Sequence, residues 1–328
     1  MLLSFEQIRN LIHGAAKVVQ LDDCIGLKRF TQEQAQLIRE YNDLYDTRAR
    51  TTAGVTLEME TDSRNLFLSV EVSNAFRNLC FSHSILVNGK RIGELRGSVP
   101  KESQTVAMEA QFDLGPGSKL VQIVFPWSAN SMIKSLQIDD GARVVPVAKK
   151  RKMLIFGDSI TQGYDAYYPE NAYAVRLTQY LNASAINKSI GGIKYYPQLA
   201  KLPDEDQPDI IVVSYGGNDF HGGNKEIFEQ DSVLFCQNLR DMYPTAKIIV
   251  MMPFCNGSRR KNEPLWYFCE LQDHLRGLSE RIENLTVVES SDFVPDDSAL
   301  FHSDGVHPLD AGHDIHFCGI VSAIQQQI

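Results

Sequence analysis

Two short stretches of the chain carry side chains that could perform nucleophilic chemistry. Gly157-Asp158-Ser159 directly follows an apolar run at residues 153–156, and Asp304-Gly305-Val306-His307 places a carboxylate three residues before an imidazole. A serine hydroxyl becomes a nucleophile when a base removes its proton, and histidine suits that role because its ordinary pKa lies near neutral pH. A carboxylate on the other imidazole nitrogen fixes the tautomer. Ser159, His307 and Asp304 are therefore candidates for acyl-transfer chemistry.

Ser159 also has a structural interpretation, in which it caps the helix after the strand. The catalytic interpretation rests on position, because a serine just past the carboxyl end of a buried strand lies where open α/β sheets bind their ligands. Gly157 permits a sharp turn at that point. The choice between a cap and a nucleophile depends on whether partners for Ser159 lie elsewhere in the chain.

The second half of the chain alternates apolar strands with helical segments. Strands are predicted at residues 153–156, 183–187, 209–214, 247–251 and 285–288. Helices are predicted to begin near Asn171, Glu226, Pro264 and Asp310. This alternation predicts a parallel sheet with helices on both faces. Right-handed crossovers would then gather the loops that follow the strands at one edge of the sheet.

Two further motifs follow strands at this edge. Asn187-Lys188-Ser189-Ile190-Gly191-Gly192 comes after the second strand, and Tyr215-Gly216-Gly217-Asn218-Asp219 after the third. Each motif is weak alone, because glycine pairs and Asn-Asp pairs are common in turns and caps. Together they would bring a serine, a glycine, an asparagine and a histidine to one sheet edge. We interpret Asp158 and Asp219 as acceptors that order their loops.

These motifs resemble the blocks of the SGNH hydrolases, also called the GDSL esterase/lipase superfamily. Gly157 to Ile160 is similar to the first block, with Ile160 in the usual leucine position, and the remaining matches are Gly192, Gly216-x-Asn218-Asp219 and Asp304-x-x-His307-Pro308. The resemblance covers about residues 152–328. It implies a catalytic triad of Ser159, Asp304 and His307, and an oxyanion hole made by the Ser159 and Gly192 N–H groups and the Asn218 amide. A G-x-S-x-G elbow is absent because Thr161 stands in its fifth position.

The amino-terminal part has a different period. Thr31-x-x-Gln34 is a capping box that predicts a helix ending near Tyr41. Strands with alternating apolar residues are predicted at residues 55–60, 66–72, 84–95, 104–112, 119–125 and 133–138, with an Asn88-Gly89 hairpin turn. This density of short strands predicts an antiparallel sandwich over about residues 50–147. It is similar to the β-sandwich that precedes the hydrolase domain in some two-domain bacterial members.

The predicted architecture is thus a flavodoxin-like, three-layer α/β/α SGNH hydrolase domain at residues 148–328, preceded by residues 1–147 with the smaller antiparallel β-sandwich. A length of 328 residues suits two domains. A net charge of −9 argues against a nucleic-acid partner. No apolar run has the length of a membrane span, so no membrane partner is expected. The basic run Lys149 to Lys152 is interpreted as a solvated linker.

Metal binding is not expected. The six cysteines show no metal-ligand spacing, and His302, His313 and His316 match no ligand motif with the nearby aspartates. The scattered cysteines and the lack of a signal-peptide pattern predict a reduced, cytoplasmic protein. We expect no cofactor, a small-molecule or carbohydrate ester as the partner, and a chain that could form a homo-oligomer.

The expected function is hydrolysis of a short O-acyl ester, favouring acetyl, of a carbohydrate or a similar polar alcohol. Two alternatives stay open: an acyltransferase using the same residues, and a non-catalytic carbohydrate-binding protein. The short acyl group is inferred from polar loops after the strands and from a polar loop at Phe254 to Pro264, against an apolar tunnel built with Phe220 and Trp266. The pairs Tyr167-Tyr168 and Tyr195-Tyr196 could stack on a sugar or pack between domains.

Overall fold

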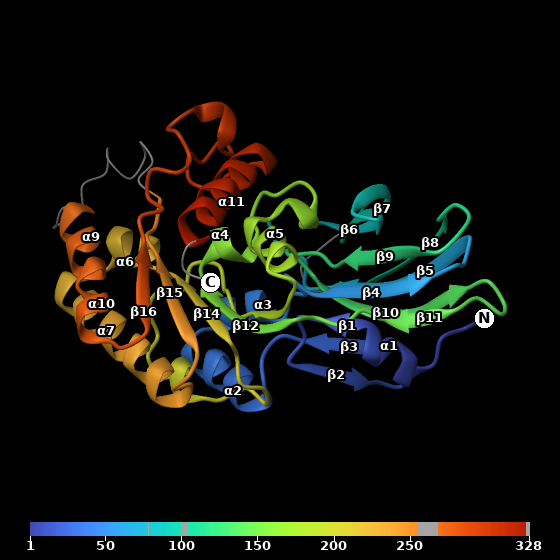
Figure 1. Ribbon diagram of the computed structural model, residues 1–328, viewed down its shortest axis with the longest axis horizontal. Coiled ribbons are helices and arrows are strands. Elements are labelled where there is room, and N and C mark those ends of the chain that lie inside the picture. The colour runs from blue at the N-terminus through green and yellow to red at the C-terminus, as the bar shows by residue number, and fades with distance from the viewer. Residues whose placement is uncertain (78, 100–103, 255–267, 326–328) are drawn as a thin grey trace. The chain divides into compact units, whose positions relative to one another are not determined.

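The structure is a computed structural model that describes residues 1–77, 79–99, 104–254 and 268–325. The chain divides into two compact units (Figure 1). The first unit consists of residues 1–31, 46–149 and 168–170, and the second of residues 32–45, 150–167 and 171–328. A single boundary at 147/148 would separate the same two sets of sheets, but residues 32–45 pack with the second unit.

The first unit contains two antiparallel sheets. One has the strand order β1-β4-β9-β6-β7, with β11 also paired to β4: β1 (Ile12–His13), β4 (Thr56–Thr61), β9 (Lys119–Val124), β6 (Cys80–Val87), β7 (Lys90–Ser98) and β11 (Val144–Pro146). The other has the order β2-β3-β10-β5-β8: β2 (Lys17–Gln20), β3 (Ile25–Lys28), β10 (Asn130–Ile138), β5 (Asn65–Ser73) and β8 (Val106–Asp113). The predicted antiparallel sheets are confirmed.

Side-chain alternation explains why these strands could be predicted. Along β5, Leu66, Leu68, Val70 and Val72 are fully buried while their neighbours are half-buried. The hairpin between β6 and β7 turns at Asn88 and Gly89, whose φ angles are 49° and 77°. Because both residues adopt positive φ, Asn-Gly is the sequence that this two-residue turn favours.

Three strands near the amino terminus lie outside the predicted sandwich range. β1, β2 and β3 occupy parts of residues 12–28, which carry little periodic signal because each strand has four residues or fewer. Gly26 within β3 further weakens the signal, yet a Cβ there would lie 2.9 Å from Val19 Cγ2 on the paired strand β2. The short helix α1 (Phe5–Leu11) starts at a Ser4 capping box.

The prediction of a solvated basic linker is wrong for its first residue. Lys149 Nζ lies 2.7 Å from Glu58 Oε2, with the two side chains 8% and 3% exposed. A buried ammonium needs a charged or hydrogen-bonding partner, so Glu58 accounts for this lysine. The next residues leave the linker altogether, because Arg151 and Lys152 begin a strand of the second unit.

The second unit has a five-stranded parallel sheet in the order β13-β12-β14-β15-β16. The strands are β12 (Arg151–Gly157), β13 (Ala183–Asn187), β14 (Ile210–Ser214), β15 (Lys247–Met251) and β16 (Leu285–Val288). This is the flavodoxin-like order, in which ligands bind at the carboxyl ends of the strands where the order reverses. That point lies between the carboxyl ends of β12 and β14.

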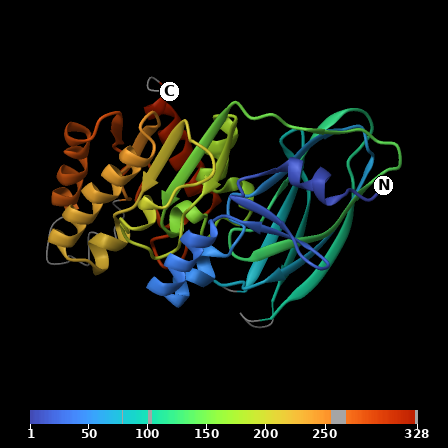
Figure 2. The ribbon, with the colours of Figure 1, turned by 90° about the horizontal axis from the view of Figure 1, so that it is seen from below.

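Helices flank this sheet on both sides (Figure 2). The principal ones are α5 (Tyr173–Tyr180), α7 (Lys225–Met242), α9 (Phe268–Arg276), α10 (Leu278–Arg281) and α11 (Asp310–Ile324). Shorter turns are α4 (Ser159–Gln162), η1 (Pro169–Asn171), η2 (Leu199–Lys201), α6 (Gly217–Gly222) and η3 (Ser298–Leu300). The three-layer α/β/α prediction is confirmed.

The helix predicted after Thr31 is confirmed as α2 (Gln32–Tyr41), and α3 (Asp43–Ala49) follows it. The helix α2 packs against η2 of the second unit. Among the helices of the described ranges, none combines the length and the apolar character that a membrane crossing requires.

Candidate active site

The nucleophile loop, residues 157–163, begins where β12 ends. Asp158, not Ser159, caps the helix α4: its side chain accepts the Ile160 N–H at 3.0 Å, and Ser159 is the first helical residue. The capping interpretation of Ser159 is therefore wrong. Glycine is required at 157, because a Cβ there would come 2.2 Å from Thr161 Oγ1. Gly163 ends the turn in the left-handed region with a φ of 104°.

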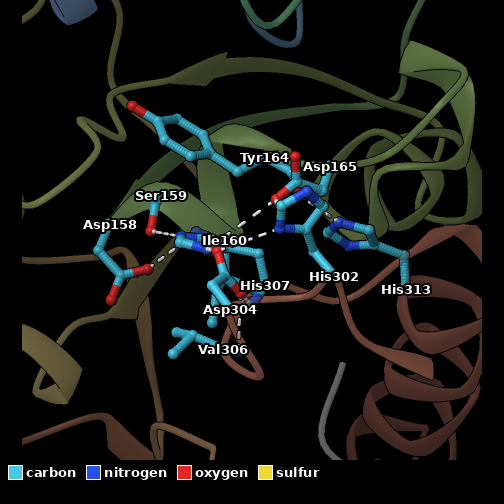
Figure 3. Close-up of polar contacts among 10 residues, drawn as sticks. All are labelled: Asp158, Ser159, Ile160, Tyr164, Asp165, His302, Asp304, Val306, His307 and His313. Atoms are coloured by element: carbon cyan, nitrogen blue, oxygen red, sulfur yellow. Dashed lines mark hydrogen bonds and ion pairs between the residues drawn. The ribbon is translucent and has the colours of Figure 1, made fainter. Parts of the chain in front are cut away.

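Ser159 is hydrogen-bonded to the histidine that the sequence singles out (Figure 3). The distance from Ser159 Oγ to His307 Nε2 is 2.7 Å, and that from His307 Nδ1 to Asp304 Oδ2 is 2.8 Å. A carboxylate only accepts hydrogen bonds, so the proton of a neutral His307 lies on Nδ1. This leaves the lone pair of Nε2 facing the serine hydroxyl, which is the arrangement that a general base needs.

The histidine loop, residues 302–308, is ordered largely by its own groups. Asp304 Oδ1 accepts the backbone N–H of Val306 at 2.9 Å and of His307 at 3.1 Å. The His302 N–H donates to the His307 carbonyl, and the Gly305 N–H donates to the His302 carbonyl, both at 2.8 Å. One oxygen of Asp304 thus orders the loop while the other holds the imidazole.

Further groups around His307 were not found from the sequence. The Tyr164 ring stacks on the imidazole, with centroids 5.3 Å apart and planes 26° apart. Asp165 Oδ2 lies 4.0 Å from Nδ1 of both His307 and His302. Both residues come just after the turn α4. Their closeness to Ser159 in the sequence is the one signal that could have pointed to them.

A small cluster beside the relay could hold a cation. Asp165, His302 and Asp304 each offer one ligand atom, and these atoms lie within 4.8 Å of one another. His302 Nδ1 is 3.5 Å from Asp304 Oδ2, the same oxygen that accepts from His307. A cation bound there would compete with His307 for that oxygen. The sequence-based expectation of no metal stays a prediction.

The glycine loop, residues 187–193, is tied to the nucleophile loop by backbone and side-chain bonds. The Ile190 N–H donates to the Gly157 carbonyl at 2.9 Å, and the Gly191 N–H donates to Gln162 Oε1 at 2.7 Å. Gly192 has a φ of 83°. Among the described residues, neither the Ser159 nor the Gly192 N–H donates a hydrogen bond to the protein. Both donors can therefore receive an external oxygen.

Asn218 approaches the same place from α6. Its amide nitrogen donates to the Ile193 carbonyl at 3.1 Å and lies 3.5 Å from Asp158 Oδ2. The first bond orients the amide, whereas the second is long and therefore weak. Because an amide nitrogen carries two hydrogens, the hydrogen near Asp158 can turn to a developing negative charge. The structure thus brings the loops of Gly192 and Asn218 to the nucleophile loop of Ser159. The sequence predicted that these loops would lie at one edge of the sheet.

The neighbouring carboxylate of Asp219 is 4% exposed and orders its loop by accepting the Tyr195 N–H at 3.2 Å. Burial raises the pKa of this carboxyl group to about 7, and the Tyr195 bond and Lys194 oppose that rise only in part. The interpretation of Asp158 and Asp219 as loop-ordering acceptors is confirmed.

The other histidines near the carboxyl end are core residues. His313 bonds to the Tyr164 carbonyl at 3.2 Å and accepts the Tyr173 N–H at 3.4 Å, and burial lowers its pKa to about 4. Burial also lowers the pKa of His316 well below its ordinary value. Both side chains stay neutral at pH 7 and pack within the second unit.

The predicted tyrosine pairs do not act as pairs. Tyr195 is buried against Tyr215 and Phe235, whereas Tyr196 stacks on Tyr41 with centroids 4.3 Å apart. Tyr167 is exposed. Tyr168 belongs to the first unit, where the Arg91 guanidinium lies 3.2 Å from its ring centroid. The polar loop predicted from Phe254 to Pro264 lies outside the described residues except for Phe254. Trp266 also lies outside them.

Sequence comparison now identifies the domain that carries this site. Residues 155–315 match the model of the GDSL-like Lipase/Acylhydrolase family. The chain carries a GDSL-like lipase/acylhydrolase domain. The match includes the nucleophile loop, the glycine loop, Asn218 and the histidine loop, so all four motifs of the GDSL-like domain lie within it. No curated protein matches the chain in a sequence search.

Solved structures share the fold of the GDSL-like domain and of the sandwich before it. A salicylyl-acyltransferase from a tetracycline biosynthetic pathway matches with a TM-score of 0.81 at 19% identity, over 96% of this chain and 94% of its own. A putative GDSL-like lipase from Bacteroides ovatus matches with 0.76 at 18% identity, over 99% and 97%. An acetyl xylan esterase from Butyrivibrio proteoclasticus matches with 0.66 at 17% identity, over 100% and 98%.

Proposed function

We propose that the protein is a serine esterase that hydrolyses a short-chain O-acyl ester, with acetyl favoured, of a carbohydrate or a similar polar alcohol. The observation that carries the proposal is the hydrogen-bonded series Asp304, His307 and Ser159, with distances of 2.8 and 2.7 Å. It lies beside two backbone N–H groups that are available to an external oxygen. A cap or a packing role for Ser159 requires neither feature.

The chemistry follows from these positions. Ser159 Oγ attacks the ester carbonyl while His307 Nε2 takes its proton, and Asp304 stabilises the resulting imidazolium. The carbonyl oxygen becomes an oxyanion, which accepts hydrogen bonds from the Ser159 and Gly192 N–H groups and the Asn218 amide. His307 then gives its proton to the leaving alcohol, and an acyl-enzyme remains. Water, activated by the same histidine, releases the acid and restores Ser159.

The polar character of the loops after the strands of the second unit and the descriptions of similar solved structures support a small acyl group and a polar alcohol. Several of the similar solved structures are described as carbohydrate esterases. Among them are the acetyl xylan esterase and a family two carbohydrate esterase from Cellvibrio japonicus. These likenesses motivate the substrate class.

An acyltransferase is the second candidate, because the salicylyl-acyltransferase shares the fold over both units. The same acyl-enzyme would be intercepted by an alcohol in place of water. The two candidates differ only in what reaches the acyl-enzyme first. Product analysis with a polyol acceptor separates them, because transfer yields a new ester and hydrolysis yields the free acid.

A chain-length series tests the proposal. Aryl esters with one chromogenic alcohol and acyl groups from acetyl to dodecanoyl should give a kcat/KM that falls steeply beyond butyryl, because each methylene without an apolar wall forgoes about 0.8 kcal/mol of burial. An optimum at octanoyl or longer would contradict the short-acyl proposal. A wild-type chain that binds oligosaccharides but turns over no ester would point to a non-catalytic binding protein, and Ser159→Ala provides the blank.

We also propose that the protein works in the cytoplasm. Among the described cysteines, Cys24, Cys80, Cys236, Cys269 and Cys318 are all free thiols. Free thiols suit a reducing compartment, since oxidising compartments favour disulfides. Fractionation of the cells that make the protein tests the location, and recovery in an extracytoplasmic fraction would contradict it.

A further inference from the structure

The glycine loop is held from an unexpected direction, by the amino-terminal segment 32–45. Tyr45, at the start of α3, donates its hydroxyl hydrogen to the Gly192 carbonyl at 2.9 Å. These residues are 147 positions apart in the chain, yet both belong to the second unit. The carbonyl that Tyr45 binds belongs to the residue whose N–H is a proposed oxyanion donor.

This hydrogen bond completes a set of anchors around one peptide group. The Gly192 N–H belongs to the peptide between Gly191 and Gly192. On one side of it the Gly191 N–H is bound by Gln162 Oε1 at 2.7 Å, and on the other side the Gly192 carbonyl is bound by Tyr45. Ile193 is fixed in turn by the Asn218 amide at 3.1 Å. Glycine turns more freely than any other residue, so without such anchors the donor would be poorly directed.

A second contact from the same segment holds the base of the loop. Lys188 is fully buried, and its ammonium lies 2.5 Å from Asp204 Oδ1 and 2.7 Å from Gln34 Oε1 on α2. Gln34 also donates to Asp204 Oδ2 at 3.3 Å and to the Leu202 carbonyl at 2.9 Å. A buried ammonium requires several acceptors, and Gln34 supplies one of them. The segment 32–45 is therefore hydrogen-bonded to the glycine loop at two residues, Lys188 and Gly192.

We propose that Tyr45 is a positioning residue for the oxyanion hole, which aims the Gly192 N–H through its hydrogen bond to the Gly192 carbonyl. The role proposed for Tyr45 is exerted through Gly192 and not on the reacting atoms. An oxyanion donor is effective only when it is fixed in advance, so a freer Gly192 should weaken transition-state binding more than substrate binding. The inference rests on the proposed esterase function.

The variant Tyr45→Phe removes the hydroxyl and keeps the ring. Its matched control is Tyr41→Phe, because Tyr41, the last residue of α2, stacks on the Tyr45 ring with centroids 5.7 Å apart and is about half exposed. With a short aryl ester we expect kcat of Tyr45→Phe to fall roughly tenfold, with KM within twofold of the wild type. Tyr41→Phe should keep both constants, and both variants should melt within a few degrees of the wild type.

Methylboronic acid gives an independent readout, because its adduct with a serine hydroxyl is a tetrahedral anion that mimics the oxyanion. Its dissociation constant should rise in Tyr45→Phe by about the same factor as kcat falls, and stay unchanged in Tyr41→Phe. Equal behaviour of the two variants, or a raised KM with unchanged kcat, would overturn the inference. Failure of the proposed function looks different: the wild type itself would neither turn over the ester nor bind the boronate.

Discussion

The two loops that supply the catalytic relay are held in place by different means. The nucleophile loop is part of the core: Ser159 is 8% exposed, Asp158 caps the turn, and Thr161 is fully buried against Gly157. The histidine loop lies nearer the surface, with the side chains of His307 and Asp304 exposed by 15% and 32%. It is ordered by hydrogen bonds among its own residues, chiefly those of Asp304.

Because of this difference, the residues that keep a loop in position can be tested separately from those that take part in the reaction. The place of Ser159 is determined by packing around β12, so removing its hydroxyl should alter the reaction and little else. Asp304 both orders a loop and holds the imidazole, so its substitution affects two functions at once. Variants that divide these functions therefore test whether the distinction between a core-held nucleophile and a self-ordered base is real.

The largest effect is expected for Ser159→Ala. The variant loses the only atom that can form the proposed acyl-enzyme, and removal of such a nucleophile reduces kcat by about a millionfold. Because the packing of the loop does not depend on Oγ, the melting temperature should change by only a degree or two. Steady-state kinetics and thermal unfolding check both parts. An active alanine variant, or labelling of another residue by a serine-directed phosphonate, would remove Ser159 from its role.

The next effect concerns Asp304→Asn. The amide oxygen can still accept the Val306 and His307 N–H groups, so the histidine loop should stay ordered. The amide nitrogen, however, donates to Nδ1 and drives the proton of His307 to Nε2, where it can no longer accept from Ser159. Loss of the correct tautomer reduces kcat by roughly ten thousandfold in a comparable triad.

The variant Asp304→Ala provides the comparison, because it removes both oxygens. We expect it to lose at least as much activity as Asp304→Asn and, in addition, to melt at a lower temperature. If Asp304→Asn loses less than tenfold in kcat, another acid must hold His307. Asp165, 4.0 Å from His307 Nδ1, is then the group to test with Asp165→Asn.

The same distinction explains what could be predicted from the sequence. β13, β15 and β16 have the predicted bounds, because a short run of apolar and β-branched residues between polar ones has few alternatives to a buried strand. Ser159, Asn218 and Asp304 could be found because each lies in a loop with a local motif. Their meeting follows from the parallel sheet, whose order brings the post-strand loops together.

The features that were missed are contacts between distant parts of the chain. Tyr45 binds Gly192, Glu58 neutralises Lys149, and Asp165 approaches His307, each without a periodic or local pattern. The strands β1 to β3 were missed for a related reason: they are too short to show a period and are stabilised by pairing with strands far along the chain. Only the folded chain shows these partners.

A smaller effect on turnover is expected for Asn218→Ala. Its amide is one of three proposed oxyanion donors, and loss of one donor typically lowers kcat by roughly a hundredfold to a thousandfold. KM should change little, because the bond strengthens only in the transition state. Asn218→Asp keeps the size but removes the donor, and should resemble the alanine variant. A raised KM with an unchanged kcat would mean that Asn218 binds substrate instead.

Substitution of Asp219 is expected to have the smallest effect on turnover. Its main effect should be on stability, because the Asp219 carboxyl group is buried. Burial raises its pKa from 3.8 to about 7, so between these values the folded protein holds a proton that the unfolded chain has released. The folded state then binds more protons, and its stability falls as the pH rises from about 4 to about 7. Above pH 7 the loss is complete, with a ceiling of roughly 4 kcal/mol because one pKa unit corresponds to about 1.36 kcal/mol.

Asp219→Asn removes this titration while keeping an oxygen for the Tyr195 N–H. We therefore expect the variant and the wild type to melt together near pH 4, and the variant to melt several degrees higher at pH 8. Thermal unfolding at both pH values measures the difference, with Asp22→Asn as the control because Asp22 is exposed in the first unit. If the difference in melting temperature between the variant and the wild type does not depend on pH, Asp219 is ionised throughout. The loop that carries Asn218 would then be held by a buried charge and not by a neutral acid.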